Sequence, residues 1–187
     1  ITWSLVGSEM CIRDRSNHLF IFGLGYVGQH LATELHRRGW QITGTTRHPE
    51  KLKPNLPNNW QILRFEGGSK IPGLSSYLSK ASHVITTISA LAGYDPVMRS
   101  HAKELHEFSG WIGYVSATSV YPNQENSFID ETIPAAPNTK RGLARLKAEQ
   151  EWQKLCKAEV FRVAGIYGPR RNVIFALLDG RARIIEK

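Results

Sequence analysis

The chain has 187 residues, of which 41% are hydrophobic and 21% charged, values typical of a globular domain with a core of its own. No apolar run approaches the ~20 residues that cross a bilayer, so we expect no membrane association and a cytoplasmic protein. Its two cysteines, Cys11 and Cys156, indicate no disulfide framework. The net charge of +8 gathers in residues 140–187, where 12 Lys or Arg face 5 Asp or Glu. Such a basic half suits nucleic acid or phosphorylated small molecules, and without an RNP-like aromatic stretch or a zinc-finger spacing we expect no nucleic-acid partner.

The predicted elements alternate between strand and helix along the chain. Residues 1–16, "ITWSLVGSEMCIRDRS", resemble translated sequencing-adaptor DNA, so we expect them to be foreign or disordered and the folded domain to span 17–187. Strands are predicted over 18–22, 41–46, 60–65, 83–88, 111–116 and 159–164, and helices over 26–38, 96–108 and from 138 onward. The proline-rich stretch 47–59 predicts at most a short or irregular helix. This alternation indicates an α/β Rossmann fold, a doubly wound parallel sheet with helices on both faces.

The first strand is followed by Gly23, Gly25 and Gly28, a G-x-G-x-x-G motif that opens an amphipathic helix. In dinucleotide-binding folds the first glycine permits a tight turn, the second lets a pyrophosphate approach, and the third lets helix pack on strand. The helix N-terminus offers free N–H groups to the phosphates. The alternative is a glycine-rich turn that only packs. We predict cofactor contacts from six residues: Gly23, Leu24, Gly25, Tyr26, Val27 and Gly28.

The second strand ends in Thr45, Thr46 and Arg47, without the Asp or Glu that would bind the ribose 2′-hydroxyl of NAD. An Arg there accommodates a 2′-phosphate, so we predict NADP as the cofactor, with NAD as the alternative. Arg47 would otherwise be a solvated loop cation. Ser89 and Ala90 follow the fourth strand at the edge where parallel sheets bind ligands, and we predict that they adjoin the cofactor.

Three later segments carry a resemblance: "YVSATSVYP" (114–122), "FIDETIPAAP" (128–137) and "FRVAGIYGP" (161–169). In this order and spacing the sequence resembles the extended short-chain dehydrogenase/reductase superfamily, the nucleotide-sugar epimerase/dehydratase group. The resemblance implies a small-molecule substrate such as a phosphorylated or nucleotide sugar, and a homodimer. Members are longer than this chain, and "GRARIIEK" (180–187) predicts a strand with no terminating signal. We therefore expect a chain cut short, without most of its substrate lobe.

The resemblance also implies an altered active site. The superfamily's Ser/Thr position falls on Ala117, its catalytic Tyr on Arg141 and its Lys on Arg145. Arg has a pKa above about 12 and cannot replace the phenol in proton exchange.

Two functional hypotheses follow from this altered site. In the first, the protein is an enzyme with reassigned groups. Arg141 and Arg145 would bind a phosphate or carboxylate, and Thr118 or Tyr121 would transfer the proton. In the second, the protein binds NADP without turnover, as a sensor or scaffold. The two arginines could otherwise form a solvated helix face, with Glu149 as an ion-pair partner.

Other polar residues give weaker signals. Tyr121 could be a packing tyrosine instead of a cofactor neighbour. Asp130 and Glu131 match an acidic pair that orders a loop, with Asp130 a weak candidate acid. His101 and His106 lack the i, i+4 spacing of helical metal ligands, and the chain has no Cys/His cluster, so we predict no metal site.

Overall fold

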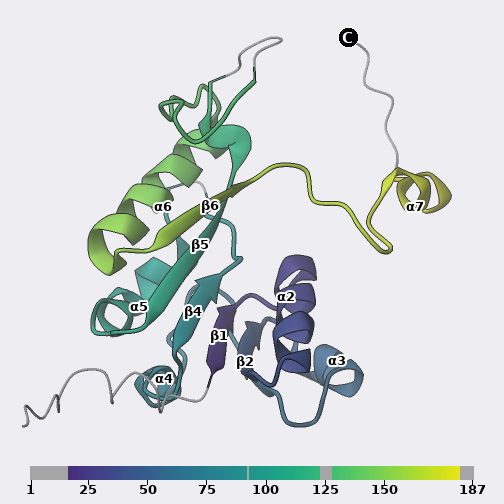
Figure 1. Cartoon of the computed structure of the whole chain (residues 1–187), viewed down its shortest axis with the longest axis vertical. Coiled ribbons are helices and arrows are strands. Elements are labelled where there is room, and N and C mark those ends of the chain that lie inside the picture. Colours follow the sequence, from purple (N-terminus) through teal and green to yellow (C-terminus); the bar gives the residue numbers. More distant parts are fainter. Residues whose placement is uncertain (1–16, 92, 123–127, 182–187) are drawn as a thin grey trace, which may run out of the picture.

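The computed structural model describes residues 17–91, 93–122 and 128–181. Six strands and the helices between them alternate along this part of the chain (Figure 1). The first half contains β1 (His18–Phe22), α2 (Tyr26–Arg37), β2 (Gln41–Thr46), α3 (Pro49–Leu52), the 3₁₀ turn η1 (Lys53–Asn55), β3 (Gln61–Arg64) and α4 (Leu74–Leu78). The second half contains β4 (His83–Thr86), α5 (Pro96–His106), β5 (Trp111–Ala117), the 3₁₀ turn η2 (Thr118–Val120), α6 (Lys140–Cys156), β6 (Glu159–Val163) and α7 (Val173–Leu178).

All strands are parallel and lie in the order β3-β2-β1-β4-β5-β6. The chain moves outward from β1 through β2 to β3, then crosses back to β4 and continues in the opposite direction. The order therefore reverses between β1 and β4, and a crevice at the carboxyl ends of these two strands is where sheets of this kind bind ligands. The predicted α/β doubly wound parallel sheet is confirmed.

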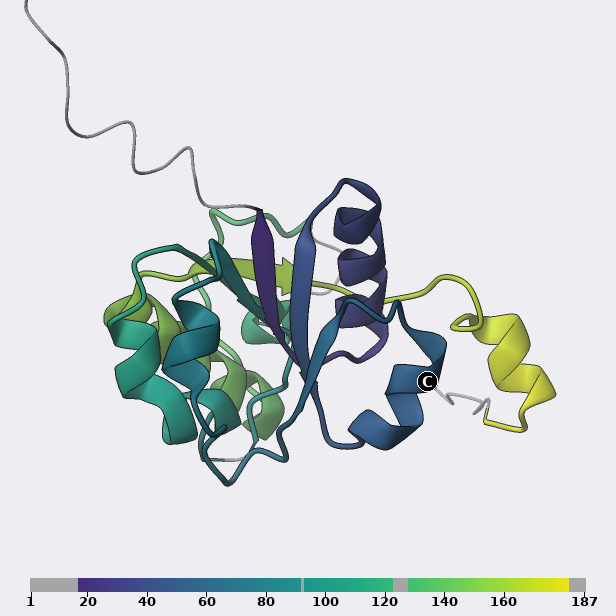
Figure 2. The same ribbon diagram turned by 90° about the horizontal axis from the view of Figure 1, so that it is seen from below.

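A hydrophobic cluster lies on each face of the sheet, and different helices cover each one (Figures 1 and 2). On one face α4, α5 and α6 pack over a core that includes Phe20, Tyr114 and Trp152. On the other face α2 and α3 pack over a core that includes Ile21 and Ile42. Strand β1 is buried along its whole length because it contributes to both clusters.

The predicted elements agree closely with the structure in the first half of the sheet. The predicted bounds of β1 and β2 are confirmed, and the stretch 47–59 contains only the short α3 and η1. Two short helices, α4 and α7, were not predicted from the sequence. The segments predicted as foreign or disordered (1–16) and as most of a terminal strand (182–187) lie outside the described residues.

Helix α7 differs from the others in its surroundings. Figures 1 and 2 show it apart from the sheet, at the end of the arm that follows β6. Its large apolar side chains are exposed: Val173, Ile174, Phe175, Leu177 and Leu178. None of the helices in the described part of the chain could span a membrane.

Candidate nucleotide-binding site

The loop between β1 and α2 is held by the carboxyl ends of the two strands that flank β1. The Gly23 N–H donates to Thr45 Oγ1 (2.9 Å), and the Leu24 N–H donates to the Thr45 carbonyl (2.7 Å). From the β4 side, Thr87 Oγ1 donates to the Gly23 carbonyl (2.7 Å). Gly23 itself has φ +95°, a left-handed conformation that L side chains rarely adopt. The loop therefore has a defined shape before any ligand binds.

The other two glycines of the motif face different surroundings. A Cβ on Gly28 would lie 2.2 Å from the Gly23 carbonyl oxygen, so this position keeps helix and loop in contact. A Cβ on Gly25 would meet nothing within 4 Å. Gly25 is the N-cap of α2 and has no side chain to cap it, so the N–H groups of the first turn are left for a ligand.

A hollow of about 390 Å³ lies beside this helix start, between α2 and the segment that follows β6. Tyr26 and Val27 line one side, and Ile166, Tyr167 and Pro169 line the other. The Tyr26 hydroxyl donates to the Pro169 carbonyl (3.3 Å). The segment after β6 thus returns to the N-terminus of α2, next to the glycine loop.

Arg47 directly follows β2, at the same edge of the sheet as the glycine loop. Its side chain is exposed, and none of the salt bridges among the described residues involves it. Its neighbour Thr46 accepts a hydrogen bond from the His48 N–H (3.3 Å), which turns the chain away from the strand. Arg47 is therefore a cation at the end of β2 that is available to a ligand.

Arg145 on α6 is 6% exposed and reaches into the interior of the protein. Its guanidinium donates from Nη1 to the Val115 carbonyl (3.0 Å) and to the Tyr114 hydroxyl (3.4 Å), and from Nη2 to Ser89 Oγ (2.6 Å). It joins α6 to β5 and to the segment after β4. The hypothesis of a solvated face is wrong for Arg145.

Glu149, one turn further along α6, pairs with a different arginine. Its carboxylate accepts two bonds from Arg162 Nε (3.2 Å each) and one from Arg162 Nη2 (2.8 Å). Glu149 is 1% exposed, and the bonds to it raise the pKa of the Arg162 guanidinium further above its usual value. The Arg162 guanidinium also lies 4.9 Å from the centre of the Tyr121 ring. The alternative in which Glu149 pairs with Arg145 on a solvated face is therefore wrong, and this second network anchors β6 to α6.

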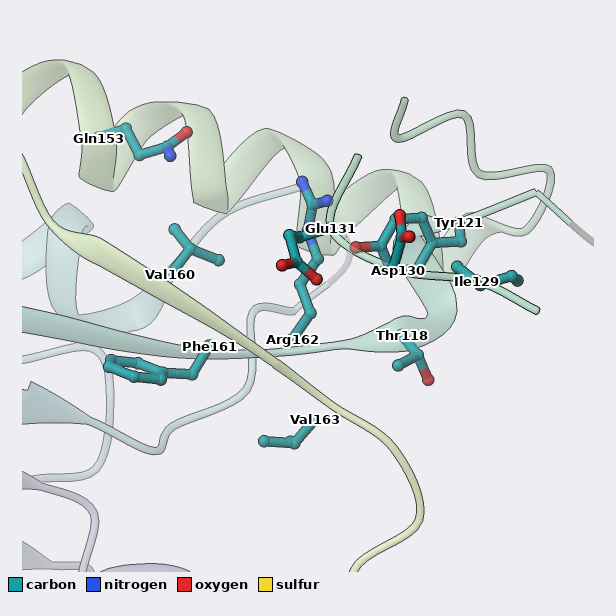
Figure 3. A pocket seen from close by; sticks show the side chains of 10 residues that line it. All are labelled: Thr118, Tyr121, Ile129, Asp130, Glu131, Gln153, Val160, Phe161, Arg162 and Val163. Carbon is teal, nitrogen blue, oxygen red and sulfur yellow. The ribbon is translucent and has the colours of Figure 1, made fainter. Parts of the chain in front are cut away.

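A second hollow, of about 680 Å³, lies where this network reaches the surface (Figure 3). Its walls come from η2 and the residue after it, the loop at 129–131, helix α6 and strand β6. It brings together Thr118, Tyr121 and Asp130, three residues that the sequence suggested for proton transfer. Bonds from the Thr132 hydroxyl and N–H lower the pKa of Asp130, so this carboxyl group is an anion at neutral pH and no proton donor.

Known proteins with a similar sequence or fold cover most of this chain. No protein-family model matches it. Protein YeeZ of Escherichia coli (strain K12) is 29% identical over 165 residues, which are 81% of this chain and 60% of YeeZ. A solved conserved protein of unknown function from Silicibacter pomeroyi DSS is 33% identical, with a TM-score of 0.72 over 83% of this chain and 55% of that one. This chain thus spans somewhat over half the length of both relatives.

Solved epimerases share the same architecture at lower identity. UDP-glucuronic acid 4-epimerase from Bacillus cereus, solved with UDP-glucuronic acid and NAD, is 15% identical with a TM-score of 0.65, over 87% of this chain and 63% of that one. The chain thus has the same kind of α/β fold as these solved epimerases, with helices on both faces of a parallel sheet.

The three positions that the sequence resemblance aligns with catalytic residues have different environments. Ala117 ends β5, and its neighbour Ser116 is buried with no hydrogen-bond partner for its hydroxyl among the described residues. Arg141, in the first turn of α6, is exposed, whereas Arg145 is buried. The two arginines share a helix face but not an environment, so the structure does not form a joint clamp from them.

The buried polar groups around Arg145 were not predicted from the sequence. Tyr114 stacks on Trp152 (5.7 Å between ring centres), and burial raises the pKa of its phenol to about 12. Asp95, 1% exposed, caps α5 through the N–H groups of Val97 and Met98, and burial raises the pKa of its carboxyl group. The sequence does contain a signal that this helix face is buried, because residues at i, i+3, i+4 and i+7 share one face. These positions are Arg145, Ala148, Glu149 and Trp152.

Among the described residues no three His, Cys, Asp or Glu side chains are placed to hold a metal.

Proposed function

We propose that this protein binds a nicotinamide dinucleotide at the loop of residues 23–28, with NADP(H) preferred to NAD(H). One observation carries the proposal: Gly25 faces open space at the uncapped start of α2, beside the point where the strand order reverses. The solved relatives that contain NAD support it, including the Bacillus cereus epimerase. Leu24, Tyr26 and Val27 would approach the diphosphate from this loop, and Ala90 would adjoin the cofactor from the segment after β4.

The preference for NADP(H) is supported by the residues at the carboxyl end of β2. Thr46 and Arg47 stand where a carboxylate would favour NAD, and the Arg47 side chain is exposed at the end of its strand. A guanidinium binds a phosphate dianion through paired N–H donors, which a ribose hydroxyl cannot match.

The reaction we propose is that of an epimerase, dehydratase or reductase acting on a phosphorylated or nucleotide sugar. Arg141 would bind an anionic group of the substrate from the start of α6, and Thr118 or Tyr121 would take part in proton transfer. One observation favours a second candidate function, an NADP-binding sensor or scaffold without turnover: neither Arg141 nor the buried Arg145 can act as the base.

The test is a fluorescence titration of the protein with NADPH and with NADH. Gly25→Val should abolish binding and leave the fold intact, because a Cβ added at this position meets no atom within 4 Å and the side chain would occupy the space proposed for the diphosphate. Thr33→Val, an exposed position further along α2, is the matched control and should bind normally. Equal affinities of Gly25→Val and wild type would disprove the site, and tighter binding of NADH would disprove the preference. A turnover screen with sugar nucleotides then separates the enzyme from the sensor.

A further inference from the structure

The hydrogen bond between Ser89 and Arg145 connects the surface of the protein with its interior. Ser89 is exposed in the segment after β4, whereas Arg145 is 6% exposed on α6, and the Nη2–Oγ distance is 2.6 Å. Short bonds of this kind, from a charged donor, are roughly twice as strong as neutral ones. The bond fixes the position of the Ser89 oxygen.

The hydroxyl hydrogen of Ser89 remains free to donate a hydrogen bond. A serine hydroxyl has one donor hydrogen and two acceptor lone pairs. The guanidinium has only donors, so it uses a lone pair of Ser89 Oγ and leaves the hydroxyl hydrogen unused. No acceptor for that hydrogen lies among the described residues, so the O–H is available to a bound molecule.

Arg145 interacts electrostatically with the buried Asp95 but donates no hydrogen bond to a carboxylate among the described residues. Its hydrogen-bond acceptors in the described chain are all neutral: the Tyr114 hydroxyl, the Val115 carbonyl and Ser89 Oγ. A buried cation whose hydrogen-bond acceptors are all neutral polarises those groups more strongly than it would in water. The Ser89 O–H is therefore a stronger donor than an isolated serine.

The position of Ser89 relates this donor to the glycine loop. Two residues earlier, Thr87 Oγ1 donates to the Gly23 carbonyl (2.7 Å), which holds the end of β4 against the loop. Ser89 thus lies at the same edge of the sheet as the proposed diphosphate site, after the strand at which the strand order reverses.

We propose that Ser89 and Arg145 act as one unit in ligand binding: Arg145 is a positioning residue that orients and polarises the Ser89 hydroxyl, and this hydroxyl donates a hydrogen bond to an oxygen of the bound dinucleotide. This inference rests on the proposed function. It gives Arg145 a task that needs no contact with the ligand, in place of the anion clamp expected from the sequence.

The test is a double-mutant cycle on NADPH affinity with Ser89→Ala, Arg145→Lys and the double variant. Each single change should weaken binding about 10-fold, since either change removes a charge-assisted hydrogen bond. The double variant should bind NADPH as tightly as the single variant with the lower affinity, because Arg145 acts through Ser89. Ser89→Thr keeps the hydroxyl and should recover most of the lost affinity. Ser79→Ala, an exposed serine at the other end of the sheet, is the control.

Thermal unfolding of each variant separates binding from folding. A purely structural Arg145 would lower the melting temperature in Arg145→Lys and leave the affinity of Ser89→Ala at the wild-type value, and this result overturns the inference. The inference is also overturned if the loss of NADPH affinity in the double variant equals the product of the losses in the two single variants. A wild-type protein that binds neither NADPH nor NADH refutes the proposed function itself, which is a different outcome.

Discussion

Replacing Gly28 by alanine should destabilise the fold, whereas the same change at Gly25 should not. The added Cβ at position 28 would lie 2.2 Å from the Gly23 carbonyl oxygen and 3.4 Å from Ile21 Cγ2. Real Cβ atoms essentially never come within 3.0 Å of such a neighbouring heavy atom, so α2 must move away from the loop. The loop has little freedom to yield, because Thr87 Oγ1 holds that same carbonyl at 2.7 Å.

The size of the effect follows from two opposing contributions. Forcing an extra methyl group into a packed contact costs about 1–3 kcal/mol, and here the obstacle is backbone, so we take about 3 kcal/mol. Alanine in a helix is favoured over glycine by about 1 kcal/mol. The net loss of about 2 kcal/mol corresponds to a melting temperature lower by about 4–8 °C for a chain of this size.

Thermal unfolding followed by circular dichroism measures this difference directly. Gly25→Ala is the matched control, because its Cβ meets nothing within 4 Å and its backbone has φ −77°. We expect its melting temperature to equal that of wild type. A Gly28→Ala protein as stable as Gly25→Ala would refute the assignment of position 28 to packing and position 25 to the ligand.

Three further predictions concern other parts of the structure. Glu149→Gln should lower the free energy of unfolding, measured in urea, by about 3 kcal/mol, because it breaks a buried ion pair with Arg162. Glu34→Gln, at an exposed ion pair, is the control and should lower it by less than about 0.5 kcal/mol. Equal losses in the two variants would contradict this prediction. Burial lowers the pKa of His101 in the folded protein, so below about pH 6.5 the unfolded chain binds more protons than the folded one. The free energy of unfolding should therefore fall as pH decreases in this range, by at most about 1.4 kcal/mol per pH unit. This part of the pH dependence should be absent in His101→Gln. Arg47→Gln should weaken NADPH binding roughly 10-fold and leave NADH binding unchanged, with Arg37→Gln as the control. Equal losses of affinity for the two cofactors would refute a contact between Arg47 and the 2′-phosphate.

The sequence predicts the sheet well because its signals are local. Strands β1 and β2 are short runs with a Gly or a charged residue at their boundaries, and their predicted bounds agree with the structure. Helix α4 has only five residues, "LSSYL", too few to show a helical period. Helix α7 is six residues of almost purely apolar sequence, a run that periodicity cannot distinguish from a buried strand.

The candidate site was only partly predictable, because the environment of a charged side chain depends on tertiary contacts. Arg145 and Arg141 are identical in type and one turn apart, and the sequence treats them alike. Their difference arises from β5, which brings the Val115 carbonyl and the Tyr114 hydroxyl to the guanidinium of Arg145. A buried Arg requires such acceptors, and no local pattern reveals that a neighbouring strand supplies them.

The groups around Arg145 also limit the chemistry that this site can perform. A general acid or base works best with a pKa near the operating pH. The Tyr114 phenol has a pKa raised to about 12 and is fully buried, and an arginine side chain does not act as a base near neutral pH. The Ser89–Arg145 pair can therefore stabilise an oxygen by hydrogen bonding, but it cannot accept a proton near neutral pH. Binding of the dinucleotide should accordingly depend on both residues, while any turnover needs a proton acceptor outside this pair, for which we propose the hollow beside Tyr121.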